Sequence, residues 1–439
     1  MARADCLSVS IDLHSQTFCQ RFLERGVGKT SFKKFPPQKN IVKTIGIICE
    51  CNPFHGGHQY LIDCACKSGA EAVICVMSGN FVQRGEAAIL SPHARAEILV
   101  SSGADAVVEL PFPYAASSAE FFGRAGVEIL SRLGVDEIWF GSETGDLSIL
   151  SRFAETAASP AFREAYIKRA EGGDGTASAY FDLLSEMSGV DAACAPNDIL
   201  AVSYLRAIRT LGAKIRPVTV KRQGSGYAED EVTDGQYPSA TALRRVWEEH
   251  EVEAVVPYLP GVCGEVSRRE VRAQRAPAML KHAEALVLGT LALTPQKELE
   301  CYAGLCGGLA GRIRKAATRA TTLEEFWQLC ATKKYPDARI RRGVLYALLR
   351  AKREDFHKPV AYVRLLGANE TGRAFLASAR KTSDLCVVTR QTDLPNTPEA
   401  ERQFELETAV AALYSKCLPK AIAADEQLRR PPVIFEDKK

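Results

Sequence analysis

One nine-residue stretch, Glu-Cys-Asn-Pro-Phe-His-Gly-Gly-His at positions 50–58, constrains the fold of this chain more than any other. The apolar run 45–49 before it is typical of a buried parallel strand, and apolar residues at helical spacing follow over 59–68. The stretch is therefore predicted to be a strand-to-helix turn, with two glycines where the backbone comes close to another group. The N–H groups and the positive dipole end at the start of a helix bind phosphate well.

Two histidines make this turn a candidate catalytic element. His55 and His58 could donate hydrogen bonds to phosphate oxygens as charge develops in a transition state. The alternative is structural: the histidines cap the helix, and the glycines only make a tight turn. The chain contains 7 histidines, so a pair of them in one strand–turn–helix context favours phosphate chemistry.

The following segments alternate between strands and helices, which predicts an α/β fold with a Rossmann-like parallel sheet. The expected strands are 45–49, 71–77, 106–110, 137–140 and 215–220, and the expected helices are 59–68, 91–101, 117–133 and 196–211. Ligands of such sheets lie beyond the carboxyl ends of the strands. Four of these strands are followed by the loops 50–58, 78–86, 111–114 and 141–143. We therefore expect these loops to converge on one site.

Two later helix starts also carry polar residues. Asn197 lies near the start of helix 196–211, where capping alone and a ligand contact are both open. The stretch Ser-Ala-Thr-Ala-Leu-Arg at 239–244 begins another helix. Its hydroxyls and Arg244 could bind phosphate through charge-assisted hydrogen bonds. The alternative there is a plain N-cap with a solvated arginine.

Helical patterns dominate after Val246, and they cover 277–291, 309–318, 322–331 and 337–350. Helix 337–350 carries Arg339, Arg341 and Arg342 opposite an apolar face. Residues 333–381 contain 13 Lys or Arg against 4 Asp or Glu, interleaved with Tyr335, Phe356 and Tyr362. This pattern is a candidate electrostatic footprint for nucleic acid. The alternative is an ordinary solvated helix face.

Composition narrows the class of protein. The net charge is +3, so any affinity for nucleic acid must come from a local patch. No run approaches 18 apolar residues, so no membrane span is predicted. The 14 cysteines lie mostly in apolar runs, and Cys49-x-Cys51 and Cys64-x-Cys66 lack the spacing of usual zinc sites. We interpret them as reduced thiols of a cytoplasmic protein, with no metal cluster.

With these motifs in hand, the chain resembles the tRNA(Met) cytidine acetate ligase family, bacterial enzymes of the HxGH-type nucleotidyltransferase superfamily. The resemblance covers about residues 42–415. Its most specific parts are 45–58, 77–86, 109–111, 140–143 and 239–244, with weaker similarity at 339–342 and 362–367.

The resemblance implies a two-step reaction. Acetate attacks the α-phosphate of ATP to give acetyladenylate, and the wobble cytidine of elongator tRNA(Met) then takes the acetyl group to give N4-acetylcytidine. The implied ATP site consists of Ile48, Cys49, Glu50, Cys51, Asn52, Pro53, Phe54, His55, Gly56, Gly57, His58, Gln59, Tyr60, Leu61, Gly141, Asn197 and Arg222. His55 and His58 would stabilise the pentacoordinate phosphate, and Arg244 would hold the β- and γ-phosphates. Mg²⁺ is expected to arrive with the nucleotide.

The same resemblance suggests a domain plan. Residues 42–250 would form the nucleotidyltransferase-like ATP-binding catalytic domain, and residues 251–425 a mostly helical domain that grips the tRNA backbone. Residues 426–439 are expected to be a loose tail. Residues 1–41 carry seven basic and three acidic side chains and look like a disordered or over-called extension. We hypothesise that Val42, just before the first strand, is the real start. The sequence predicts no oligomeric state.

Two stretches depart from the family pattern. Tyr227 is followed by Ala-Glu-Asp where the family has Gly-Tyr-His-Asp, and the tract 197–201 reads Asn-Asp-Ile-Leu-Ala where the family has Asn-Asn-Ile-Leu-Gly. Both could alter what the second substrate pocket accepts. Neither removes a residue that we assign to the ATP phosphates.

Two other functions stay open at this point. One is a nucleotidyltransferase that adenylylates a phosphorylated small molecule, although the large basic helical region exceeds what such an enzyme needs. The other is a tRNA-binding protein without catalysis, although a pure binder has no need of His55, His58 and Arg244 at a phosphate turn. The salt dependence of RNA binding would separate the first from the ligase, and ATP–pyrophosphate exchange would separate the second.

Overall fold

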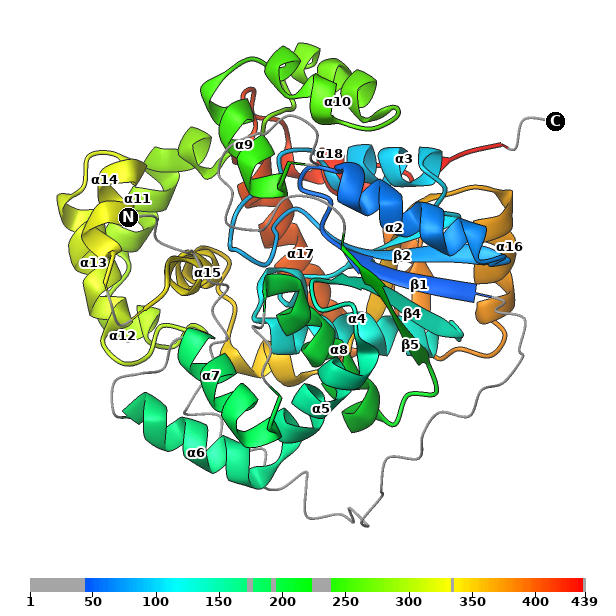
Figure 1. Ribbon diagram of the computed structural model, residues 1–439. Coiled ribbons are helices and arrows are strands. Elements are labelled where there is room, and N and C mark those ends of the chain that lie inside the picture. Colours follow the sequence, from blue (N-terminus) through cyan, green and yellow to red (C-terminus); the bar gives the residue numbers. More distant parts are fainter. Residues whose placement is uncertain (1–43, 172–176, 191–194, 223–237, 333–334, 437–439) are drawn as a thin grey trace.

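The computed structural model describes residues 44–171, 177–190, 195–222, 238–332 and 335–436. Among these residues, eight strands form one sheet in the order β5-β4-β1-β2-β3-β6-β7, with β8 paired to β6 (Figure 1). The strands are β1 (Thr44–Cys49), β2 (Ala72–Ser78), β3 (Ala106–Leu110), β4 (Glu137–Ser142), β5 (Arg216–Lys221), β6 (Tyr362–Ala368), β7 (Cys386–Val388) and β8 (Val433–Ile434). All neighbours among β1–β5 pair in parallel, which confirms the predicted parallel sheet.

Helices cover both faces of these five strands. The helices of this part of the chain are α2 (Gly56–Lys67), α3 (Pro92–Ser101), α4 (Ala119–Arg132), α5 (Leu147–Ala158), α6 (Pro160–Glu171), α7 (Ala177–Ser188), α8 (Pro196–Leu211) and α9 (Ala240–Glu249), of which α6 and α7 pack on α5. Figure 1 shows α2 and α3 on one side of the sheet and α4, α5 and α8 on the other. Successive side chains of a strand point to opposite faces. Val73 therefore packs with α2 and α3, whereas Ile74 packs with α4.

The helix starts follow the expected chemistry with one exception. Ser91 caps α3 by accepting a hydrogen bond from the N–H of Ala94 at 3.3 Å, and Pro92 occupies the first turn. Capping, one of the two roles left open for Asn197, does not hold, because the N-cap residue of α8 is Ala195. Pro196 is favoured at the first helical position. The cap therefore lies before Pro196, and Asn197 lies within the first turn.

The helical region contains α10 (Cys263–Arg272), α11 (Glu284–Leu293), α12 (Gln296–Leu299), α13 (Leu309–Arg319), α14 (Leu323–Cys330), α15 (Asp337–Leu348), α16 (Glu370–Ala379), α17 (Pro398–Cys417) and α18 (Ala424–Arg429). Short 3₁₀ turns are η1 (Tyr114–Ala116), η2 (Val252–Ala254), η3 (Val256–Tyr258), η4 (Leu280–Ala283), η5 (Arg353–His357) and η6 (Gln391–Asp393). The predicted helix 277–291 is therefore wrong at its start, where η4 precedes α11. Phe81 and Phe112, from the loops after β2 and β3, join the core of this region.

The sheet is not confined to the segment 42–250. β6 comes from the region predicted to be mostly helical, and it pairs antiparallel with β3. Without β6, β3 would be an edge strand with unpaired backbone groups. The prediction of a loose tail is also wrong, because β8 pairs with β6 and the N–H of Phe435 donates to the carbonyl of Ala368 at 2.9 Å. A short strand between helical patterns carries little periodic signal of its own.

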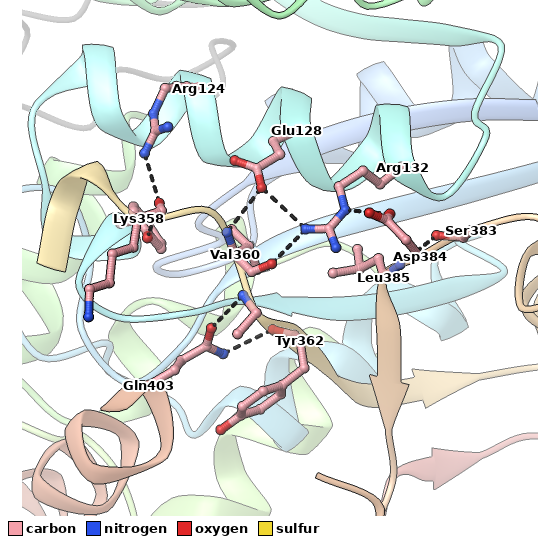
Figure 2. A network of polar contacts seen from close by, with 12 residues as sticks. Arg124, Glu128, Arg132, Lys358, Val360, Tyr362, Ser383, Asp384, Leu385 and Gln403 are labelled. Carbon is pink, nitrogen blue, oxygen red and sulfur yellow. Dashed lines mark hydrogen bonds and ion pairs between the residues drawn. The ribbon is translucent and has the colours of Figure 1, made fainter. Parts of the chain in front are cut away.

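Polar side chains on α4 fix the chain where it enters β6, as Figure 2 shows. Arg124, Glu128 and Arg132 lie four residues apart on one face of α4. Arg124 donates to the carbonyl of Lys358 at 3.2 Å, and Arg132 donates to the carbonyl of Val360 at 2.6 Å. Glu128 accepts the N–H of Val360 at 3.0 Å. The helical region is thus tied to the same helix that covers β1 and β2.

The predicted extension 1–41, the proposed start at Val42 and the family departure at 228–230 lie outside the described residues. The domain boundaries stay a prediction.

Candidate functional site

A cavity of about 180 Å³ lies at the carboxyl ends of β1, β4 and β5. It is the place where a ligand of a doubly wound sheet is expected. The predicted ATP-site residues that line it are Ile48, Cys49, Glu50, Cys51, His55, Gly57, His58, Tyr60, Leu61, Gly141, Asn197 and Arg222. Segments more than 150 residues apart in the sequence therefore meet in one wall, as the sequence predicts.

The other predicted residues lie outside this wall. They are Asn52, Pro53, Phe54, Gly56, Gln59 and Arg244. The side chain of Gln59 points toward α3, since its Nε2 donates to Asp63 at 2.8 Å and to the carbonyl of Ser102 at 3.1 Å. Asn52 accepts the N–H of Ile89 at 2.8 Å. Phe54 is buried and stacks on His58 with ring centroids 5.6 Å apart. These residues shape the turn rather than the cavity.

The expected convergence of four loops holds for three of them. The loops after β1, β2 and β4 reach the cavity, the second through Gln83 and the third through Gly141. The loop 111–114 does not, because Phe112 is buried in the core of the helical region.

The two histidines of the turn cap α2 with one ring nitrogen each. The N–H of Gly57 donates to Nδ1 of His55 at 3.0 Å, and the N–H of His55 donates to Nδ1 of His58 at 3.2 Å. A neutral imidazole has one acceptor nitrogen and one donor nitrogen. Because Nδ1 accepts in both rings, each carries its proton on Nε2. Capping uses Nδ1 of each ring and leaves the Nε2–H group to donate to a ligand. The two roles of the histidines are therefore compatible.

Burial keeps both histidines neutral. It lowers the pKa of His58 to about 4, and the positive charge of Arg222 acts in the same direction. Burial also lowers the pKa of His55 well below its usual value, and the charges of Arg222 and Arg244 act in the same direction. The turn therefore presents two neutral hydrogen-bond donors rather than two cations at neutral pH.

Glu143 is a site residue that sequence reasoning did not single out. Its Oε1 accepts from Nδ2 of Asn197 at 2.6 Å, and its Oε2 accepts the backbone N–H groups of Asn197 and Asp198, both at 3.2 Å. Arg222 forms an ion pair with the same carboxylate at 3.8 Å. Glu143 therefore positions both Asn197 and Arg222 beside the cavity. The sequence signal for Glu143 was its place in the loop after β4. Its partners Asn197 and Arg222 lie far along the chain, so the sequence did not show these contacts.

Asp198, where this chain departs from the family pattern, is fully buried behind the cavity wall. Its Oδ2 accepts from the hydroxyl of Thr144 at 2.7 Å, and its Oδ1 accepts the N–H of Thr144 at 3.2 Å. Asp198 thus holds the loop after β4, and it does not itself line the cavity.

A buried arginine ties two of the site loops together. Arg95 has no exposed surface, and its guanidinium donates to the carbonyls of Glu50 at 2.6 Å and Ser78 at 3.0 Å. It also donates to the carbonyls of Leu90 and Gly79. The loops after β1 and β2 are therefore held by one side chain of α3. The sequence gives no sign of this role, because an arginine in a helix is usually solvated.

Arg244 brings the third motif to the turn. Its Nη1 donates to the carbonyl of Asn52 at 2.8 Å, and its Nε lies 3.4 Å from Oε2 of Glu86. Ser239 caps α9 by accepting the N–H of Ala242 at 3.1 Å. The N-cap at Ser239 is therefore present. Arg244 is not simply solvated, because it donates a hydrogen bond to the backbone of the turn.

Comparison with known proteins identifies the family. A family model described as HIGH Nucleotidyl Transferase matches residues 42–429. A tRNA(Met) cytidine acetate ligase of Syntrophotalea carbinolica is 36% identical over 363 residues, 79% of this chain and 85% of the relative. That of Bacillus subtilis is 30% identical over 420 residues, 90% of this chain and 98% of the relative. This chain belongs to the tRNA(Met) cytidine acetate ligase family.

Solved structures show the same fold for the family. Thermotoga maritima TmcAL in its apo form matches with a TM-score of 0.81 and 28% identity, over 90% of this chain and 100% of that one. The form of the same protein bound with alpha-thio ATP matches with a TM-score of 0.80.

The predicted nucleic-acid footprint of this family member needs correction. Tyr335, Phe356 and Tyr362 are buried, so they are core residues rather than stacking platforms. Arg342 is buried as well, and it donates to the carbonyl of Gln83 at 3.1 Å. A count of charged residues along the sequence does not show which side of a helix packs inward. The prediction therefore treated buried basic and aromatic residues as surface residues.

None of the helices in the described part of the chain has the length and apolar character that a bilayer crossing requires.

Proposed function

We propose that this chain activates acetate with ATP and transfers the acetyl group to the wobble cytidine of elongator tRNA(Met), giving N4-acetylcytidine. One observation carries the proposal: two neutral histidines direct Nε2–H donors from a strand-to-helix turn whose cavity also includes Asn197 and Arg222. The names of its relatives and the nucleotide analogue bound to TmcAL support the same reaction class.

In the first step, a carboxylate oxygen of acetate attacks the α-phosphorus of ATP. A new P–O bond forms as the bond to pyrophosphate breaks, and acetyladenylate and pyrophosphate result. Negative charge grows on the α-phosphate oxygens in the transition state. His55 and His58 would stabilise these oxygens as fixed donors in a desolvated site, where such bonds are stronger than in water. Arg222 would supply positive charge, and Arg244 would hold the turn and the outer phosphates.

In the second step, the N4 amine of cytidine attacks the acetyl carbonyl carbon. The C–N bond forms, the C–O bond breaks with its electron pair leaving on AMP, and the nitrogen gives one proton to water. No further charge has to be supplied by the turn at this stage, because AMP is a good leaving group.

The cavity also suits the base and the metal of a nucleotide substrate. Phe122, Leu200 and Tyr204 from α4 and α8 give it an apolar wall against which adenine can pack. Nucleotide-bound Mg²⁺ needs only one or two carboxylates of the protein besides the phosphates. Glu50 is such a carboxylate among the described lining residues, so the site fits Mg²⁺. When bound, Mg²⁺ would neutralise phosphate charge.

Acetate-dependent ATP–pyrophosphate exchange, with and without bacterial tRNA, tests this function. We expect exchange in the wild type, a loss of at least a hundred-fold in His58→Ala, in line with the removal of one transition-state donor (roughly 10²–10³), and acetyl label in the tRNA. His250→Ala, an exposed histidine at the end of α9, is the matched control and should keep full activity.

Other outcomes point to the alternative functions. Exchange driven by a phosphorylated small molecule instead of acetate would indicate a small-molecule nucleotidyltransferase. Absence of exchange with retained tRNA binding would indicate a non-catalytic RNA-binding protein.

A further inference from the structure

The loop between β2 and α3 brings an unpartnered hydrogen-bond donor to the wall of the ATP cavity. Gln83 lines this cavity, and only 4% of its surface is exposed. Its Nε2 group is buried and has no hydrogen-bond partner among the described residues. Buried donors of folded proteins are normally paired, because an unpaired donor loses its hydrogen bonds to water without replacement. A ligand of the cavity can supply the missing acceptor.

The backbone of Gln83 is held without help from its side chain. Its N–H donates to Oε1 of Glu50 at 2.6 Å, and its carbonyl accepts from Nη1 of Arg342 at 3.1 Å. Two residues further on, the N–H of Gly85 donates to the carbonyl of Val82 at 2.8 Å. These backbone contacts hold the loop, which leaves the side-chain amide to a ligand.

Gln83 reaches the cavity from the side of the sheet opposite to Asn197 and Arg222. The histidine turn follows β1, which lies between β4 and β2 in the sheet. Asn197 comes from α8 and Arg222 from the end of β5, beyond β4, whereas Gln83 follows β2. The apolar wall proposed for adenine includes Leu200 and Tyr204 of the same helix α8. With the α-phosphate at the histidine turn, the space beside Gln83 is therefore open to the second reactant.

The charges around Gln83 favour a small monoanion. The outer phosphates of ATP have a cationic partner in Arg244, so they do not need the neutral amide of Gln83. The carboxylate of Glu50, which accepts the N–H of Gln83, would repel a dianionic phosphate monoester about twice as strongly as a carboxylate, because the Coulomb energy scales with charge. A carboxylic acid substrate therefore fits this place better than a phosphorylated small molecule.

We propose that Gln83 binds the carboxylic acid substrate and orients it for attack on the α-phosphate. One carboxylate oxygen of acetate forms the P–O bond. The other oxygen, which becomes the carbonyl oxygen of acetyladenylate, accepts the Nε2–H of Gln83. This assignment rests on the proposed function, in which the attacking group is a carboxylate. Because the donor holds the same oxygen before and after the attack, it acts mainly on the binding of acetate.

The kinetics of acetate-dependent ATP–pyrophosphate exchange test the assignment. Gln83→Leu removes the donor with little change in size, and Gln83→Glu also adds a negative charge. We expect the KM for acetate to rise about ten-fold in Gln83→Leu, as for the loss of a hydrogen bond to a charged group, and further in Gln83→Glu. The KM for ATP should stay within about two-fold of the wild type. Gln328→Leu, at an exposed position of α14, is the matched control and should change neither value.

Binding of acetate without turnover gives a second readout. Ligand-observed NMR follows labelled acetate in the presence of α,β-methylene ATP, an analogue that cannot release pyrophosphate. The wild type and Gln328→Leu should bind acetate equally, and Gln83→Leu should bind it about ten-fold more weakly.

Each other outcome is decisive as well. Equal acetate affinity in Gln83→Leu and Gln328→Leu would overturn the assignment, and so would an absence of acetate binding in the wild type. A raised KM for ATP with an unchanged KM for acetate would also overturn it and assign Gln83 to the phosphates. Acetate binding that depends on Gln83, in a protein without exchange activity, would refute the proposed function but support the acetate site.

Discussion

At the scale of single residues, the site depends on how each ring nitrogen of the histidine pair is used. Nδ1 of both rings is occupied by backbone N–H groups, so the orientation of each ring is set by the turn itself. The ring centroids of His55 and His58 lie 4.0 Å apart, which would disfavour two positive charges. The geometry therefore requires neutral donors, and the environment keeps them neutral.

The depressed histidine pKa predicts a pH-dependent stability. The pKa of His58 is about 4 in the folded chain, against about 6.5 in an unfolded one. Between these values the unfolded chain binds a proton that the folded chain does not, so the free energy of unfolding falls as pH is lowered from about 6.5 to about 4. His58→Gln cannot titrate and can still accept the N–H of His55, so its fall should be shallower.

Urea unfolding of both proteins at pH 7 and pH 4.5 measures this difference. The exposed His250→Gln serves as control and should keep the wild-type pH dependence. Equal slopes in the wild type and His58→Gln would show that His58 is not the titrating group.

Glu143 is predicted to act through Asn197 and Arg222. In Glu143→Ala, both side chains lose the carboxylate that orients them, and loss of hydrogen bonds to a charged group costs about 1.5–3 kcal/mol. We expect kcat/KM for ATP in the exchange reaction to fall at least ten-fold, mainly through KM. Glu143→Gln, which keeps one acceptor oxygen, should recover part of the loss. A variant with unchanged KM would refute the positioning role.

At the scale of elements, the close approach of α4 to β1 places the cavity wall. Gly126 of α4 faces Ile48, whose side chain borders the cavity, and a Cβ at Gly126 would lie 2.5 Å from the Cδ1 atom of Ile48. The same helix carries Phe122 into the wall of this cavity. The absence of a side chain at Gly126 thus allows α4 to lie close to β1 beside the cavity.

A pair of glycine substitutions tests this packing. Gly126→Ala should destabilise the protein by about 1–3 kcal/mol, the usual cost of overpacking a core. Gly289→Ala in α11 is the matched control, because a Cβ there meets no atom within 4 Å. It should stabilise the protein by about 0.5–1 kcal/mol, since alanine is the better helix former. Thermal unfolding measures both, and equal effects of the two substitutions would contradict the close approach.

At the scale of the whole molecule, the sheet joins segments from both parts of the chain. β6 pairs with β3, β8 pairs with β6, and the network on α4 anchors the chain before β6. The two predicted domains therefore share one sheet and one set of buried polar contacts. Cooperative unfolding of the whole chain follows from this arrangement.

A fragment consisting of residues 42–250 tests that statement. It would expose the edge of β3 and the apolar surface that β6 and α16 cover, so we expect it to aggregate or remain unfolded. Circular dichroism and size-exclusion chromatography of the fragment, beside the full chain, provide the measurement. A monomeric fragment with a cooperative unfolding transition would show that the predicted boundary at 250 separates two independent domains.

The sequence by itself determined the parallel strands β1 to β5 and the helix-start turn with its histidines, whereas the residues assigned to the ATP site came from the family resemblance. These features rest on local signals, because strand and helix periodicity, turn glycines and caps act over a few neighbouring residues. Only the tertiary structure decided that Arg95 and Arg342 are buried, that Glu143 orients Asn197 and Arg222, and that β6 and β8 complete the sheet. In each of these cases the partner is far along the chain, and burial depends on which surfaces meet after folding.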